Sequence, residues 1–267
     1  MYRLNMKKLP VLISIPHGGH LIPDSLKENI MLSSLDLLDD SDAFTQDIYD
    51  IGNSAEYVFK TDIARAIIDL NRSVDQYPPE YPDGVIKSHT CYDKQIYKMG
   101  MEPDENKKKQ LIHSYYLPYH DNIKRALAEK RIALALDCHS MAAIGPTNSK
   151  DKGGKRPLMC LGNVWGQTCS KLLIKRISNC FCCSFGFKSS DIQINQPFAG
   201  GYITQTYGKK SIIPWIQVEI SRELYLSQQY FNRQTLQMMD NKRLNELNQM
   251  FQTGLELFFN TFFKAAQ

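Results

Sequence analysis

Apolar runs that alternate with helical stretches extend along the whole chain. Several runs are continuously apolar, which is typical of strands that are covered on both faces. We predict seven strands, over residues 10–15, 55–60, 66–70, 131–137, 157–161, 191–195 and 212–220. We predict four helices, over residues 34–52, 103–129, 167–178 and 240–262. This alternation favours an α/β fold in which helices cover both faces of a sheet.

Prolines and two long polar segments add detail to this pattern. Pro103 suits the first turn of the second predicted helix, whereas Pro118 should kink or split that helix. Two excursions, 73–100 and 145–157, are rich in Pro, Tyr, Gly or Lys. Regular elements resume soon after each, so neither is typical of a linker, and long loops in a compact domain are often lids. We therefore predict one domain over residues 1–267.

Polar and ionisable side chains follow the ends of five predicted strands. They are His17, then Asp69, Asn71 and Arg72, then Asp137 and His139, then Asn195, and finally Glu219 with Arg222. In open α/β sheets, ligands bind beyond the carboxyl ends of the strands. We therefore expect these side chains to meet at one edge of the sheet.

This set of side chains suits a metal-dependent hydrolase. Neutral imidazoles and a carboxylate can hold a divalent ion while leaving a position open for water. The ion lowers the pKa of that water toward ~7, and a separate carboxylate then moves the proton. His17 and His139 are the candidate imidazoles, although a single strand-end histidine is more often structural. Asp42 is a better candidate ligand than Asp39 or Asp40, which can be ordinary acids of a helix start.

Further polar residues each have two interpretations. Arg65 and Arg72 could pair with nearby acids, or they could grip a substrate carboxylate with the planar guanidinium fork. His120, beside Tyr119 on a predicted helix, is more typical of a buried structural histidine. The glycine pair in "FAGGY" indicates either a tight turn or a close approach of backbone to ligand.

Composition excludes several classes of function. The chain of 267 residues has a net charge of +4, which is too weak for a nucleic-acid partner. No window approaches the ~20 apolar residues of a membrane span, and the first apolar run is too short for a signal peptide. These features predict a cytoplasmic protein. The seven cysteines are expected to be reduced and mostly buried, because cysteine is among the most buried residue types. Cys180 and Cys183 have the spacing of a zinc site, but no second pair of cysteines completes such a site.

Other catalytic patterns are also missing. The sequence has no G-x-S-x-G around Ser140 and no G-x-G-x-x-G after the first strand, which argues against a serine hydrolase or dinucleotide binding. Cys138 and His139 are adjacent on a predicted strand, and adjacent strand residues point to opposite faces. They should therefore not act together as nucleophile and base.

Seven motifs, taken in order, resemble those of N-formylglutamate amidohydrolases. They are "SIPHGG", "SDAF", "ARAIIDLNR", "YYLPYH", "LDCHS", "NQPFAGGYITQTYG" and "VEISRELY", and they span residues ~11–226. The resemblance implies a three-layer α/β/α sandwich with a mixed, mostly parallel sheet, similar to zinc exopeptidases. It implies one zinc ion and hydrolysis of an N-acyl amide, such as N-formyl-L-glutamate to formate and L-glutamate in histidine degradation.

The resemblance also implies roles for individual residues. His17, Asp42 and His139 fall where metal ligands would lie, with His20 as an alternative to Asp42. The implied catalytic residues are Glu219 as general base, His120 near the leaving amine or oxyanion, and Arg65. The implied substrate-binding residues are Arg65, Asn71, Arg72, Gly201 and Tyr202.

The sequence is compatible with more than one substrate. The excursion 73–100 and the insert "TNSKDKGGKRP" depart from the family pattern at the expected mouth of the pocket. The same chemistry could therefore act on another amide, such as a peptide or a cell-wall fragment. A binding protein without turnover is a further alternative. The oligomeric state is not predicted.

Overall fold

A six-stranded mixed sheet forms the centre of the computed structural model, which describes residues 8–129, 131–146, 149–240 and 242–264. The strand order is β2-β1-β3-β6-β4-β5. The strands are β1 (Leu9–Ile15), β2 (Ala55–Lys60), β3 (Leu134–Met141), β4 (Met159–Gly162), β5 (Ile192–Ile194) and β6 (Trp215–Ser221). All neighbours pair in parallel except β4 and β6, which are antiparallel. A small hairpin joins β7 (Phe231–Asn232) to β8 (Gln237–Met238).

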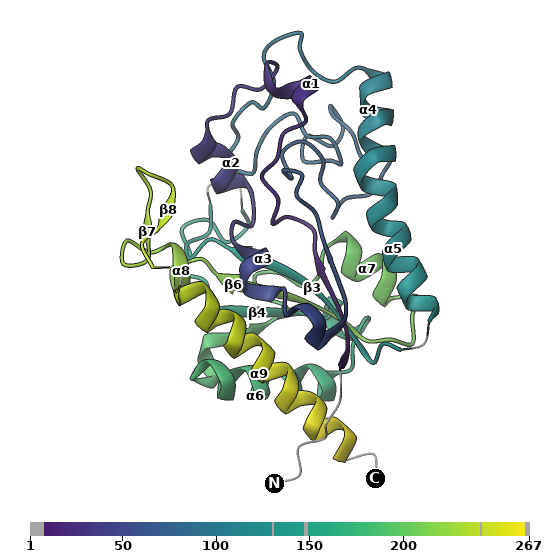
Figure 1. Cartoon of the computed structure of the whole chain (residues 1–267), viewed down its shortest axis with the longest axis vertical. Coiled ribbons are helices and arrows are strands. Elements are labelled where there is room, and N and C mark those ends of the chain that lie inside the picture. The colour runs from purple at the N-terminus through teal and green to yellow at the C-terminus, as the bar shows by residue number, and fades with distance from the viewer. Residues whose placement is uncertain (1–7, 130, 147–148, 241, 265–267) are drawn as a thin grey trace.

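Helices cover both faces of this sheet, which confirms the predicted α/β/α sandwich (Figure 1). One face carries α3 (Thr45–Tyr49), α6 (Lys171–Phe185) and α9 (Lys242–Lys264). The other face carries α4 (Glu105–Leu111), α5 (Leu117–Ala128) and α7 (Tyr202–Gly208). The short helices α1 (Asp24–Lys27), α2 (Ser34–Asp40) and α8 (Glu223–Leu226) lie in the connections. Short 3-10 turns span Gly52–Ser54, Val164–Gly166 and Ser189–Asp191.

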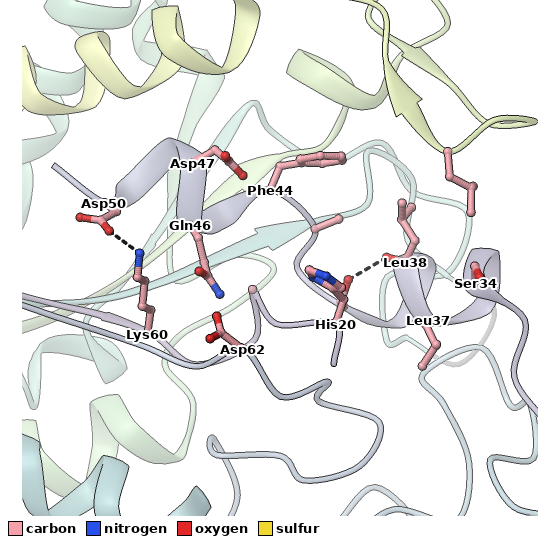
Figure 2. Close-up of a pocket in the computed structure, with 14 residues that line it drawn as sticks. His20, Ser34, Leu37, Leu38, Phe44, Gln46, Asp47, Asp50, Lys60 and Asp62 are labelled. Carbon is pink, nitrogen blue, oxygen red and sulfur yellow. Dashed lines mark hydrogen bonds and ion pairs between the residues drawn. The ribbon is translucent and has the colours of Figure 1, made fainter. Parts of the chain in front are cut away.

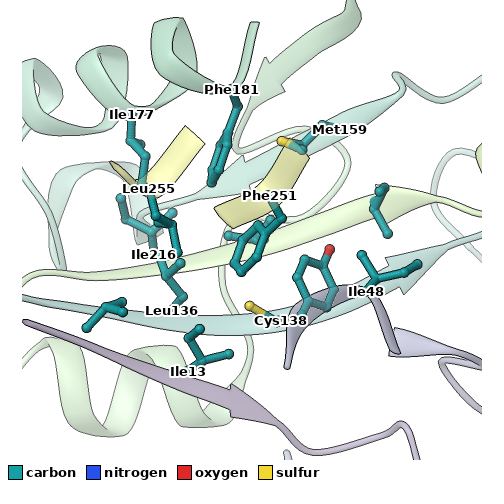
Figure 3. Close-up of a cluster of buried hydrophobic side chains, with 14 of the residues drawn as sticks. Ile13, Ile48, Leu136, Cys138, Met159, Ile177, Phe181, Ile216, Phe251 and Leu255 are labelled. Atoms are coloured by element: carbon teal, nitrogen blue, oxygen red, sulfur yellow. The ribbon is translucent and has the colours of Figure 1, made fainter. Parts of the chain in front are cut away.

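The face under α6 and α9 is a continuous apolar core (Figure 3). Leu136 and Cys138 of β3 point into it together with Ile216 of β6, as the two-residue period of a strand requires. Phe181 of α6 and Phe251 of α9 stack there, with ring centroids 5.7 Å apart. Burial of this apolar surface fixes the two helices on the sheet, at roughly 25 cal/mol per Å² removed from water.

Two of the predicted elements are wrong. Residues 66–70 are not a strand, because the amides of Ile67 and Ile68 bond to the nearby carbonyl of Ala64 and form turns instead of a ladder. The predicted helix 34–52 is interrupted between α2 and α3. The break arises where the amide of Asp42 donates to the carbonyl of His17 (3.0 Å), which turns this segment toward the sheet.

The predicted boundaries differ from the structure elsewhere. The predicted helix 103–129 is one rod in which α4 and α5 are joined by a π-helical turn, Ile112–Tyr116. Pro118 lacks an amide hydrogen, so it cannot donate to the carbonyls of this turn, and π-helical geometry occurs mostly as such single turns inside α-helices. Strand β3 continues to Met141, so Asp137 and His139 lie within it. None of the described helices is both long and apolar enough to cross a membrane.

Candidate active site

Polar side chains line the carboxyl half of one sheet face, opposite the apolar core. In the sheet register, Ser14 of β1 lies beside Asp137 of β3, and Asp137 lies beside Gln217 of β6. Two residues further on, His139 lies beside Glu219. Because every second residue of a strand faces the same way, these side chains form adjacent rows on one face. The register therefore positions His139 and Glu219 as direct neighbours.

Loops bring two further side chains to His139. His17 follows β1, and Asp42 lies in the break between α2 and α3. Nδ1 of His139 lies 2.9 Å from Oδ2 of Asp42, and Nδ1 of His17 lies 3.3 Å from the same oxygen. All three side chains are buried. Their ligand atoms all lie within 4.8 Å of one another, which is close enough to share a metal ion. Among the described residues, no other group of histidine, cysteine and acidic side chains meets this condition.

Each imidazole also contacts a second buried carboxylate. Nε2 of His17 lies 2.7 Å from Oδ1 of Asp69, and Nε2 of His139 lies 3.2 Å from Oδ1 of Asp137. Both rings therefore direct Nδ1 at Asp42 and Nε2 at an outer carboxylate. An outer carboxylate fixes the ring orientation of a metal-binding histidine and makes it a stronger ligand.

The carboxylates make this pocket strongly favourable for positive charge. Burial alone would raise the pKa of Asp42, but the imidazoles of His139 and His17 outweigh it and hold the pKa well below its usual range. Burial would likewise lower the pKa of His139, yet Asp137, Asp42 and Glu219 raise it well above its usual value. A cation bound at these residues would therefore neutralise the negative charge of the surrounding carboxylates.

Among the residues that the structure describes, no basic side chain forms an ion pair with Glu219. Burial raises its pKa to about 7, with the nearby Asp42 charge acting in the same direction and His139 opposing it. Nε2 of Gln217 donates to its Oε1 at 2.8 Å, which fixes the carboxyl group. A carboxyl group with a pKa near neutrality can both accept and return a proton.

The segment 63–72 brings Arg65, Asp69 and Arg72 to the site through turns. Nε and Nη2 of Arg65 lie 3.3 Å from Oδ2 of Asp69. Arg72 donates to the backbone carbonyls of Asn71 and Asp83 and to the Asp83 carboxylate. Both predicted arginines therefore line the site while pairing with internal acceptors.

The excursion 73–100 supplies a buried cation that sequence analysis did not single out. Nζ of Lys87 is wholly buried, 3.1 Å from Oδ2 of Asp69 and 2.8 Å from Oδ1 of Asp83. Burial would raise the pKa of Asp69, but His17, Lys87 and Arg72 hold it well below its usual range. The excursion therefore helps to keep the carboxylate behind His17 ionised.

Asn71 and Gly201 meet in close contact. Oδ1 of Asn71 accepts from the amide of Ile203 at 2.7 Å, and its Nδ2 lies 3.2 Å from Nε2 of His139. A Cβ atom at Gly201 would lie 2.5 Å from Nδ2 of Asn71, so only glycine fits. Tyr202 lines an adjoining pocket together with Asn71 and Arg72.

Two candidate histidines lie away from this group. His120 is buried, with Nδ1 2.8 Å from the Tyr207 hydroxyl and Nε2 3.0 Å from the Leu70 carbonyl, so both nitrogens are occupied. Burial lowers its pKa to about 4. His20 is exposed and lines a separate pocket with Leu37 and Leu38 (Figure 2). The structure thus groups Asp42, and not His20, with His17 and His139.

The grouped residues open onto a cleft of about 980 Å³. Its lining includes His17, Asp42, His139 and Glu219, together with Arg65 and Arg72. Cys138 is absent from this lining and lies in the apolar core on the other face. This confirms that Cys138 and His139 point in opposite directions. A charged, concave site of this kind, with perturbed acids at its base, is typical of an enzyme.

A model of the family "N-formylglutamate amidohydrolase" matches residues 9–226. The chain belongs to this family. The N-formylglutamate deformylase of Pseudomonas putida is 27% identical over 229 residues, which cover 83% of each chain.

Solved structures share the fold of this N-formylglutamate amidohydrolase family member. The crystal structure of N-formylglutamate amidohydrolase from Ralstonia eutropha JMP134 has a TM-score of 0.76 at 20% identity, covering 98% of this chain and 97% of that one. The gene product Atu2144 from Agrobacterium tumefaciens has a TM-score of 0.58 at 14% identity, covering 97% and 93%. The sandwich is therefore shared at low sequence identity.

Sequence analysis of this family member did not assign several residues that hold the site together. Arg222 donates from Nη2 to Oδ1 of Asp42 at 3.2 Å, and from Nε to the Ser140 hydroxyl at 3.0 Å. Asp137 was expected at this edge of the sheet, but its contact with the ring of His139 was not, although two residues apart on a strand face the same way. Arg222 is 180 positions from Asp42, and no local pattern indicates that pairing.

Proposed function

We propose that this N-formylglutamate amidohydrolase family member is a zinc-dependent enzyme that hydrolyses N-formyl-L-glutamate to formate and L-glutamate. The observation that carries the proposal is the convergence of His17, Asp42 and His139 beside Glu219 at the base of one cleft. The relative from Pseudomonas putida, named as an N-formylglutamate deformylase, supports the choice of substrate.

The residues present fit a divalent cation. Nδ1 of His17 is buried and has no hydrogen-bond partner among the described residues, although it faces Asp42. Two imidazoles and one carboxylate are a donor set of zinc sites that keep an open position. His17, Asp42 and His139 would hold the ion, with Asp69 and Asp137 behind the two rings. An ion bound there would polarise the amide carbonyl and lower the pKa of nearby water.

Glu219 acts as the general base. It accepts a proton from the water that attacks the formyl carbon, and it returns this proton to the amide nitrogen as the C–N bond breaks. Burial raises its pKa to about 7, and the charge of an ion bound at His17, Asp42 and His139 would lower it, so the carboxylate would be ionised and able to accept the proton. Gln217 holds the carboxyl group in place throughout.

The α-carboxylate of the substrate binds at Arg65, Asn71 and Arg72. Asn71 contacts His139, and both arginines contact Asp69, the carboxylate behind His17. The α-carboxylate is attached to the carbon that bears the scissile amide. Gly201 allows Asn71 to approach closely, and Tyr202 lines the adjoining pocket. His120 acts as a positioning residue, because its Nε2 bonds to the carbonyl of Leu70 in this same segment.

Formate release from N-formyl-L-glutamate tests the proposal directly. The purified protein should contain about one zinc ion per chain by elemental analysis and should release formate. Removal of the metal with a chelator should abolish release, and added zinc should restore it. A panel that includes longer amides decides the substrate class. Protein that releases no formate after zinc is supplied would refute the proposal.

A further inference from the structure

Arg156 lies in the same cleft, on the connection between β3 and β4. Isolated bridges pair Ile144 with Lys155 and Gly145 with Lys152, so this connection folds back on itself. The amide of Arg156 donates to the carbonyl of Ala143 at 2.9 Å. Its side chain is only 5% exposed, although several of its neighbours on this connection are exposed. The connection therefore places one buried guanidinium group at the wall of the cleft.

The contacts of Arg156 occupy one edge of its guanidinium. Nε lies 2.6 Å and Nη2 lies 2.8 Å from the two carboxylate oxygens of Asp151. The group also lies over the ring of Phe198, 5.0 Å from its centroid. No acceptor from the described residues reaches Nη1. A guanidinium has a second edge, formed by Nη1 and Nη2, that can bind a carboxylate through two hydrogen bonds.

The cleft as a whole favours an anionic ligand. Its lining contains five basic residues and three acidic residues, the latter being Asp42, Asp151 and Glu219. Asp42 and Glu219 lie at the bottom of the cleft, beside His139, and Asp151 is paired with Arg156. Basic side chains along the walls raise the local concentration of anions.

The residues assigned to the α-carboxylate leave the second carboxylate of the substrate without a partner. N-formyl-L-glutamate has two carboxylates, and its α-carboxylate must stay near the scissile amide. Arg65, Asn71 and Arg72 are assigned to the α-carboxylate, and the internal contacts of both arginines hold them on that side of the cleft. The side chain of glutamate can extend away from these residues, toward another wall of the cleft.

We infer that the free edge of Arg156 binds the side-chain carboxylate of the substrate and thereby selects glutamate over neutral amino acids. This inference rests on the proposed function, because it assigns a specificity-determining residue to that site. Asp151 holds the guanidinium in the required orientation, and Phe198 packs against its face. The lysine-rich insert in the sequence thus contributes a substrate contact.

A comparison of two substrates tests the role of Arg156. Wild type and Arg156→Gln are assayed with N-formyl-L-glutamate and with N-formyl-L-glutamine, which differs by loss of the side-chain charge. We expect the substitution to lower kcat/KM for the glutamate substrate by about 10- to 100-fold and to leave the glutamine substrate nearly unchanged. Arg156→Lys, which keeps the charge without the fork, should recover only part of the loss.

Two further variants control for indirect effects. Lys152→Gln removes one positive charge from an exposed position on the same connection and should keep the wild-type preference. The double variant Asp151→Asn with Arg156→Gln avoids an unpaired Asp151 and should lose the preference as the single variant does. If Arg156→Gln keeps the wild-type ratio between the two substrates, the inference is overturned.

A binding measurement separates this inference from the proposed reaction. Calorimetry gives the affinities of zinc-loaded wild type and Arg156→Gln for L-glutamate and L-glutamine, without any turnover. Wild type should prefer L-glutamate, and the variant should lose that preference. Failure of wild type to release formate would refute the proposed reaction, but this binding comparison would still decide the role of Arg156. A wild type that binds the two amino acids equally would overturn the inference.

Discussion

The two faces of strand β3 differ in chemistry over the carboxyl half of the strand, although their residues alternate in the sequence. Leu136 and Cys138 point into the apolar core under α6 and α9 (Figure 3). Asp137 and His139 point to the opposite face, where they contact other ionisable groups. One strand therefore serves a dry core on one side and a candidate metal site on the other.

The apolar face of β3 contributes mainly to stability, and the polar face contributes mainly to function. Apolar burial stabilises the fold without any specific partner, because the hydrophobic effect is non-directional. Burial of a charge costs several kcal/mol unless the charge is paired, so each ionised group on the polar face requires defined neighbours. His139, for example, contacts both Asp42 and Asp137. Substitutions on the polar face should therefore alter chemistry, and those on the apolar face should alter stability.

Glu219→Gln should give the largest functional effect. The amide keeps the size of the side chain and can still accept from Gln217, but it cannot take a proton. We expect kcat to fall by about 10²- to 10⁴-fold while bound zinc stays unchanged. Steady-state assays with elemental analysis measure both quantities. Val218→Ala, the neighbour on the apolar face, should lower the free energy of unfolding and leave kcat of the folded protein near wild type. A nearly active Glu219→Gln variant would remove the general base from the mechanism.

Phe181→Ala should give the largest effect on stability. Phe181 is fully buried in the apolar core and stacks on Phe251 of α9. Loss of its ring creates a cavity, which typically costs about 3–5 kcal/mol of unfolding free energy. Urea denaturation followed by circular dichroism measures this loss. Zinc content and kcat per folded molecule should not change. A large loss of zinc affinity in the folded variant would show that the two faces are coupled.

Sequence analysis predicted the layers of the fold because local apolar patterns determine them. The predicted strand 55–60 coincides with β2, and the first predicted strand differs from β1 by one residue. The sequence-based predictions were wrong where tertiary contacts override the local pattern. Residues 66–70 are as apolar as a buried strand, but in the structure this buried segment forms hydrogen-bonded turns. The predicted helix 34–52 ends early because Asp42 bonds to the distant His17 backbone.

The same distinction applies to the candidate site. His17, Asp42 and His139 lie in short motifs, so they could be singled out, and the structure places them together. The contact of Lys87 with Asp69 and the hydrogen bond from Arg222 to Asp42 join distant segments. No local spacing predicts such contacts. The role of Arg156 depends on which donors its internal partners leave free, and only the folded structure shows this.

His120 should make stability depend on pH, although it lies outside the cleft. Its pKa is about 4 in the folded protein and about 6.5 when unfolded. Below pH 6.5 the unfolded state therefore binds a proton that the folded state does not bind until about pH 4. The contribution of His120 to the free energy of unfolding should be fully present above pH 6.5. It should fall by about 3 kcal/mol as the pH drops to 4.

The measurement is urea denaturation at several pH values between 7 and 4, for wild type and His120→Gln. Other groups also titrate in this range, so the informative quantity is the difference between the two proteins. The stability advantage of wild type should shrink as the pH falls. Parallel curves would show that burial does not hold His120 neutral in the folded protein.

Asp137→Asn should produce the smallest of these effects, and it distinguishes a functional outer carboxylate from a merely structural one. Asp137 contacts Nε2 of His139 and accepts a hydrogen bond from the Thr204 hydroxyl, and the amide oxygen of asparagine can still accept one. The fold should therefore survive, but the imidazole should become a weaker ligand. We expect zinc affinity to fall by about 10- to 100-fold in competition with a chromogenic chelator. Asp121→Asn, which removes an exposed carboxylate from a surface ion pair, provides the matched control. Equal zinc affinities for these two variants would mean that the carboxylate behind His139 supports only the fold, and the functional face of β3 would then begin at His139.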